Sequence, residues 1–155
     1  MAAMNHRPVA KAEMLIRKPV EEVFEAFVNP EITTKFWFTK SSGRLEAGRH
    51  VRWEWEMYGA SDEVYAEKIE PNKRIVIQSS DGTKAEWIFT SRKDTETFVA
   101  ITSSGFTGSD EDIVHQAIDS MGGYMIVLCG LKALLEHNVI LNLVADKAPD
   151  AHVSR

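Results

Sequence analysis

Two glutamates in the stretch HVRWEWEMYG, Glu54 and Glu56, have the spacing of a carboxylate pair that could do acid–base work. Side chains two residues apart on a β-strand share one face of the sheet. A general acid or base needs a pocket in which burial or a neighbouring charge shifts its pKa. Apolar residues alternate with these glutamates, so the glutamates should lie on the solvent face. We therefore predict no catalytic role for them, and no carboxylate or histidine that projects into a pocket with a perturbed pKa.

Other residue types that carry out chemistry are scattered along the chain. His50, His115 and His137 belong to separate predicted elements and lack H-x-x-x-H spacing, so we expect no metal site. Cys129 lies in the apolar run YMIVLCGL, where burial would raise the pKa of the thiol and make it unreactive. The polar side chains that remain on predicted strands are Tyr65, Ser79 and Thr102. Their spacing forms no catalytic set, and the sequence predicts no cofactor.

The aromatic residues of the same stretch alternate with its charged residues. If Arg52 and the glutamates face solvent, then Val51, Trp53, Trp55 and Met57 face inward. Two interpretations are open: this row belongs to a close-packed core, or its indoles and its flexible methionine line a ligand cavity. The residues that we assign to such a cavity are Trp37, Trp53, Trp55, Met57, Trp87, Phe89, Met121, Tyr124 and Leu128.

The first part of the chain is predicted to hold one strand and two short helices. Residues 10–17 alternate loosely and suit a strand. Pro19 stops strand pairing and supplies the fixed φ of a first helical turn. The helix that follows has an apolar stripe and ends at Asn29-Pro30. The next stretch, EITTKFWFTK, suits a second short helix or a turn.

The rest of the chain is predicted to form a meander and a long helix. From Arg49 to Gly105 the hydrophobic period is two, and Asp81-Gly82 is a strong hairpin signal. Consecutive strands with short turns indicate an antiparallel sheet with one buried face. Ser109 and Asp112 then predict a capping box for a last helix that runs to about Asn138.

Length and composition predict one globular domain. The chain has 155 residues, of which 44% are hydrophobic and 26% charged. We expect a flexible N-terminus over residues 1–9, a single domain over 10–140 and a polar C-terminal tail over 141–155. A net charge of −5 and the lack of a basic cluster exclude nucleic acid and anionic membranes as expected partners. The single cysteine and the polar N-terminal residues favour a cytoplasmic location.

Several motifs carry a resemblance to a known family. The stretch from Ile16 to Glu31, IRKPVEEVFEAFVNPE, is followed by Phe36-Trp37, and later come IEPNKRIVI, TSSGF and GGYMIVLCGLKALLE. Their order resembles that of the activator of heat-shock-protein-90 ATPase homologue family, the AHSA-type SRPBCC proteins of the START-like helix-grip superfamily. The resemblance covers residues 10–140 and departs at Tyr124, where the family commonly has tryptophan.

This resemblance implies an α+β helix-grip fold. In it, a curved antiparallel sheet of six to seven strands wraps around the long C-terminal helix, with two short helices after the first strand. It also implies a cavity between sheet and helix that many relatives use for apolar ligands. The preferred function is therefore the binding of an apolar, aromatic small molecule. The alternatives are a cyclase or aromatase-like enzyme in the same cavity, or a protein that acts as a chaperone-ATPase activator.

The last helix has two apolar faces. The inner stripe is predicted to consist of Ala117, Met121, Tyr124, Leu128, Leu131 and Leu135. The opposite face becomes small and apolar in its second half, where either the short helices cover it or a second copy of the chain packs. The residues that would form the seam of such a homodimer are Gly122, Ile126, Cys129 and Ala133. Gly122-Gly123 is also predicted to mark a kink or a close packing contact.

Overall fold

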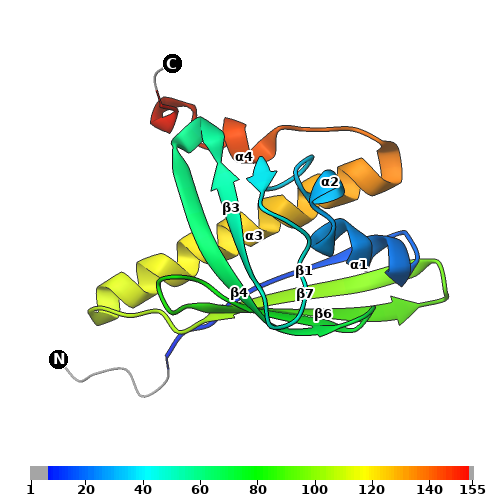
Figure 1. The fold of residues 1–155 in the computed structure, drawn as a ribbon, viewed down its shortest axis with the longest axis horizontal. Coiled ribbons are helices and arrows are strands. Elements are labelled where there is room, and N and C mark those ends of the chain that lie inside the picture. Colours follow the sequence, from blue (N-terminus) through cyan, green and yellow to red (C-terminus); the bar gives the residue numbers. More distant parts are fainter. Residues whose placement is uncertain (1–6, 154–155) are drawn as a thin grey trace.

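The computed structural model describes residues 7–153 as an antiparallel sheet that curves around one long helix (Figure 1). The sheet has seven strands in the order β1-β7-β6-β5-β4-β3-β2. The strands are β1 (Ala10–Ile16), β2 (Lys40–Ser41), β3 (His50–Trp55), β4 (Ala60–Glu70), β5 (Arg74–Gln78), β6 (Lys84–Arg92) and β7 (Glu96–Ser104). Each neighbouring pair is antiparallel. The predicted α+β helix-grip fold is confirmed. The expected flexible N-terminus, residues 1–9, lies mostly outside the described residues.

Two short helices follow the first strand, as predicted. Helix α1 (Val20–Val28) begins directly after Pro19, and α2 (Pro30–Thr33) follows with a proline in its first turn. The hydroxyl of Thr33 is buried and donates a hydrogen bond to the carbonyl of Ala26 at 2.6 Å. This bond links α2 to α1. It also satisfies the Thr33 hydroxyl, which would be costly to bury without a hydrogen-bond partner.

Helix α3 (Asp110–His137) is the long helix that the sheet holds. It begins with the predicted capping box, in which Ser109 Oγ accepts from the Asp112 amide at 3.1 Å and Asp112 Oδ2 accepts from the Ser109 amide at 3.2 Å. It ends at Asn138, whose φ of 54° is left-handed. By length and composition alone α3 could cross a membrane. The same properties belong to a core helix, and here α3 packs against β1 and β7.

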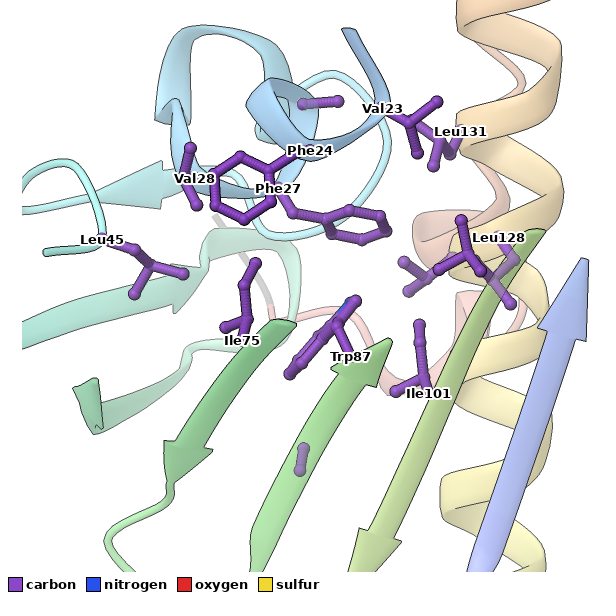
Figure 2. Close-up of a cluster of buried hydrophobic side chains, with 14 of the residues drawn as sticks. Val23, Phe24, Phe27, Val28, Leu45, Ile75, Trp87, Ile101, Leu128 and Leu131 are labelled. Atoms are coloured by element: carbon purple, nitrogen blue, oxygen red, sulfur yellow. The ribbon is translucent and has the colours of Figure 1, made fainter. Parts of the chain in front are cut away.

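The inner face of the sheet carries the core. Figure 2 shows Phe27 of α1 and Leu128 of α3 directed toward Trp87 and Ile101 of the sheet. On β3 the predicted inward row is confirmed, because Val51 and Trp53 are buried while Arg52 is exposed. Burial of such residues is the main stabilising contribution to the fold.

Two expectations for α3 need correction. Met121 was expected against the sheet, but its side chain is 47% exposed, since it lies beside the buried arc and not within it. Val127 and Leu134 are buried instead, while Leu135 is half-buried. The buried arc widens in the second half of the helix because residues 36–38 and the C-terminal segment also pack there.

The two adjacent glycines of α3 make no close contact. A Cβ atom at Gly122 or Gly123 would have nothing within 4 Å, and the helix continues through both residues. The close approach lies at Gly130, where a Cβ would come within 3.3 Å of Phe36 Cβ. The prediction of a packing contact at Gly122-Gly123 is therefore wrong, because the contact lies about two helical turns later, at Gly130.

The C-terminal segment packs on the domain. Helix α4 (Leu143–Asp146) and the 3₁₀ turn η2 (Pro149–Ala151) lie beside η1 (Glu56–Tyr58), the turn between β3 and β4 (Figure 1). The amide of Val153 donates to the carbonyl of Met57 at 2.9 Å. The domain boundaries stay a prediction, but residues 143–153, which fall within the predicted polar tail, pack on the domain.

Candidate ligand-binding pocket

A pocket of about 460 Å³ lies between the inner face of β3 to β5, helix α3 and the C-terminal segment, and it opens to solvent. The residues that line it are Trp37, Trp53, Trp55, Tyr58, Ala60, Asp62, Ile77, Ser79, Ser120, Gly123, Tyr124, Ile126, Val127, Val144, Lys147 and Ala148. A concave site of this size with mainly apolar walls is typical of small-molecule binding.

Aromatic rings form one wall of the pocket. The ring of Trp37 lies 4.8 Å from that of Trp53, 6.4 Å from that of Trp55 and 5.8 Å from that of Tyr124 between centroids. Phe38 stacks on Trp53 at 4.6 Å and holds it in place. Trp37 follows α2, Trp53 and Trp55 belong to β3, and Tyr124 belongs to α3. Three separate segments therefore fix the aromatic wall.

Trp87 lies behind this wall. Its ring centroid is 5.9 Å from that of Trp37 and 5.7 Å from that of Tyr124. Its indole N–H is buried and has no acceptor among the described residues. An unsatisfied buried donor costs about 1–3 kcal/mol, so Trp87 is the least well satisfied polar side chain next to the pocket.

The C-terminal segment supplies the outer wall of the pocket. The hydroxyl of Tyr58 donates to the carbonyl of Val144, and His152 Nε2 donates to the carbonyl of Ala145 at 2.8 Å. The rings of Tyr58 and His152 meet edge to face at 5.3 Å between centroids. Tyr58 therefore attaches the segment to the turn after β3.

A carboxylate that the sequence analysis did not assign to the cavity faces the pocket. Asp62 is opposite Trp53 in the β3–β4 register, so both side chains lie on the inner face of the sheet. Its Oδ1 accepts hydrogen bonds from the amide and hydroxyl of Ser80, at 3.2 Å and 2.6 Å. The alternation of Val64 and Ala66 as buried residues on β4 places Asp62 on their side. That alternation was visible in the sequence and could have identified Asp62.

Tyr124 is the other polar group deep in the pocket. Burial raises the pKa of the Tyr124 hydroxyl well above its usual value, and the negative charges of Asp62 and Asp81 raise it further. The phenol therefore stays protonated and is able to donate a hydrogen bond.

The residues expected in a cavity divide into two groups. Trp37, Trp53, Trp55 and Tyr124 line the pocket. Trp87, Phe89 and Leu128 are buried in the core behind it, Met57 belongs to η1 beside a smaller pocket, and Met121 faces outward. The ligand-binding role of all nine stays a prediction. The lining residues that sequence reasoning missed are Tyr58, Ala60, Asp62, Ile77, Ser120, Gly123, Val127, Val144, Lys147 and Ala148.

The polar residues weighed from the sequence have different positions. Glu54 lies beside Lys40 at 3.9 Å and Glu56 is exposed, so neither lines the pocket. Ser79 does line it. The ring of Tyr65 lies 4.9 Å from that of His50 between centroids, tilted against it, and both residues line a separate pocket.

The fold and the pocket define a helix-grip protein with an aromatic pocket between sheet and helix. The family model described as "Activator of Hsp90 ATPase homolog 1-like protein" matches residues 17–136. The chain belongs to this family, which confirms the resemblance found in the sequence. No curated protein matches the chain.

Solved structures show the same fold. SSP2350 from Staphylococcus saprophyticus is 30% identical, with a TM-score of 0.75, and the match covers 86% of this chain and 96% of that one. The Aha1 dimer from Colwellia psychrerythraea is 20% identical, with a TM-score of 0.70 and coverage of 84% and 97%. DynU16, a protein of the dynemicin biosynthetic locus, is 19% identical, with a TM-score of 0.73. Here the match covers 85% of this chain and 48% of DynU16.

Proposed function

We propose that the protein binds a small apolar molecule with an aromatic body in the pocket between the sheet, α3 and the C-terminal segment. The observation that carries this proposal is the combination of an aromatic wall with unfilled space at Gly123, where a Cβ atom would have nothing within 4 Å. A close-packed core leaves few such spaces. Flat rings on several sides favour a flat ligand, because aromatic pairs gain about 0.5–1.5 kcal/mol beyond the area that they bury.

Titration with Nile red, a neutral aromatic dye, tests this function. We expect its emission to rise, to shift to shorter wavelength and to saturate at one dye per chain, because the dye leaves water for an apolar pocket. Competition with naphthylmethanol should reverse the signal. Emission that rises without saturation, or that the competitor leaves unchanged, would indicate surface adsorption and count against the pocket.

A second candidate function is catalysis in the same pocket, of the cyclase type. It is favoured by Asp62 and Tyr124, which line the same pocket and could accept a proton and donate a hydrogen bond, respectively. The location of DynU16 in a biosynthetic locus is compatible with this candidate. A role as a chaperone partner is supported by the family description alone, and fold does not imply function. We also propose a cytoplasmic location, from the cysteine content of the sequence.

We further propose that the protein forms a homodimer, as the relative from Colwellia psychrerythraea does. The predicted seam is not an open surface, since Gly122, Cys129 and Ala133 are half-buried and Ile126 lines the pocket. The exposed apolar side chains of α3 lie on another stripe, formed by Val114 (41%), Ile118 (57%) and Met121 (47%). We assign the seam to this stripe.

Ile118→Glu should convert the dimer to a monomer, because it places a charge in the centre of the exposed stripe. Light scattering after size exclusion at micromolar concentration measures the mass. His115→Glu, also exposed on α3 but off the stripe, is the matched control and should leave the dimer intact. A monomeric wild type, or a dimer that Ile118→Glu does not disturb, would refute this assembly.

A further inference from the structure

Asp62 is the one carboxylate among the described residues that line the aromatic pocket. Both hydrogen bonds that it accepts come from Ser80 and go to Oδ1. Oδ2 has neither a hydrogen-bond donor nor an ion-pair partner among residues 7–153. A carboxylate oxygen next to apolar walls is stabilised most by a cation or a strong donor. The pocket therefore holds a negative charge that the protein itself only partly satisfies.

The rings around this charge favour the same kind of ligand group. The faces of indole and phenol rings attract cations within about 6 Å of the ring centroid. Trp53 lies directly opposite Asp62 on the neighbouring strand, and Trp37 contacts Trp53 at 4.8 Å between centroids. Trp55 and Tyr124 lie within 6.4 Å and 5.8 Å of Trp37. Asp62 and these four aromatic residues line the same pocket, so a group that enters beside Asp62 can contact aromatic rings.

The wall that the sheet forms brings a negative charge to the pocket. Lys147 is the only cationic side chain among the described lining residues, and it lies exposed on the C-terminal segment. Lys147 makes no ion pair with Asp62 in the described part of the chain. Asp81 adds a second negative charge near Tyr124, because it contributes with Asp62 to the raised pKa of that hydroxyl. The field inside the pocket therefore favours a positive group.

We propose that the ligand is an organic cation: an apolar, aromatic body that carries a protonated amine or a quaternary ammonium group. The cation lies between Asp62 Oδ2 and the rings of Trp53 and Trp37, and the body of the ligand fills the space beside Gly123. This inference rests on the proposed ligand-binding function and adds the charge of the ligand to it.

Three probes with one aromatic body test the charge. Naphthylmethylamine is cationic at neutral pH, naphthylmethanol is neutral, and naphthoate is anionic. Isothermal titration calorimetry measures the affinity of each for the full chain. We expect the amine to bind about tenfold more tightly than the alcohol, which corresponds to about 1.4 kcal/mol, and naphthoate to bind most weakly.

Two variants assign the effect to one carboxylate. Asp62→Asn keeps an acceptor for both Ser80 hydrogen bonds and should make the amine and the alcohol bind equally. Glu63→Gln removes the same charge from the adjacent, outward-facing residue of β4 and should leave the tenfold preference unchanged. If the alcohol or naphthoate binds as tightly as the amine, the cation proposal is wrong while the ligand-binding function stands. If none of the three probes binds, the ligand-binding function fails as well.

Discussion

Gly123→Leu should weaken ligand binding and leave the protein at least as stable as the wild type. Gly123 lines the pocket, and a Cβ atom added there would meet no other atom within 4 Å. A leucine side chain would occupy space that the ligand needs. Overpacking costs about 1–3 kcal/mol, so we expect a loss of affinity of about five- to 150-fold. Replacing a helical glycine gives back about 0.8–1 kcal/mol of helix stability. Dye titration and urea unfolding measure the two effects.

Gly122→Leu is the matched control for this substitution. It makes the same chemical change one residue earlier in α3, and a Cβ there also has nothing within 4 Å. Gly122 does not line the pocket, because consecutive helical residues point about 100° apart. The affinity of the Gly122→Leu variant for Nile red should equal that of the wild type. Equal loss of binding in both variants would show that the helix, and not the pocket, had been disturbed.

Trp55→Ala should strongly lower the affinity of the protein for Nile red, and it should lower the free energy of unfolding only slightly. Trp55 lines the pocket, and its side chain is only half-buried. Loss of about 100 Å² of contact with the ligand corresponds to about 2.5 kcal/mol, or between ten- and hundredfold in affinity. Trp53→Ala should destabilise the fold by about 3–5 kcal/mol, because Trp53 is 2% exposed and stacked on Phe38. Chemical denaturation separates the two variants.

Phe98→Ala is the control for the tryptophan variants. Phe98 is an aromatic residue of β7 that is half-buried outside the pocket, 5.8 Å from the guanidinium carbon of Arg92. Replacement of Phe98 by alanine should not change the affinity of the protein for Nile red. If Trp55→Ala destabilises the protein as much as Trp53→Ala does, Trp55 is a core residue, and the aromatic wall gives no support to ligand binding.

The sequence was a good guide wherever one local rule determined the outcome. Pro19 and Ser109 mark the helix starts, because a fixed φ and a capping side chain act within one turn. The alternation of Val51 and Trp53 with Arg52 determined the inner face of β3, because a strand with one buried face has a period of two. These local rules were sufficient to predict the sheet and the long helix, and they placed Val51 and Trp53 on the inner face of β3.

The rest of the pocket depends on contacts between distant segments. Asp62 is a charged residue on the inner face, and a rule that sends charges to solvent misplaces it. Ser80, eighteen residues away in the chain, holds its carboxylate, and that bond depends on the tertiary fold. Val144 and Lys147 belong to a polar stretch whose packing is decided by Tyr58. The sequence of α3 likewise does not indicate that Gly130, and not Gly122 or Gly123, packs closely against Phe36.

The outer wall of the pocket lies beyond residue 136, where the family match ends. It is attached through main-chain groups, since Tyr58 donates to the carbonyl of Val144 and the amide of Val153 donates to the carbonyl of Met57. Such attachment depends little on which side chains the segment carries. Side chains of the segment can therefore be exchanged without loss of these main-chain attachments. Because three residues of the segment line the pocket, Val144, Lys147 and Ala148, exchange of residues 143–153 is expected to change which molecules the pocket accepts.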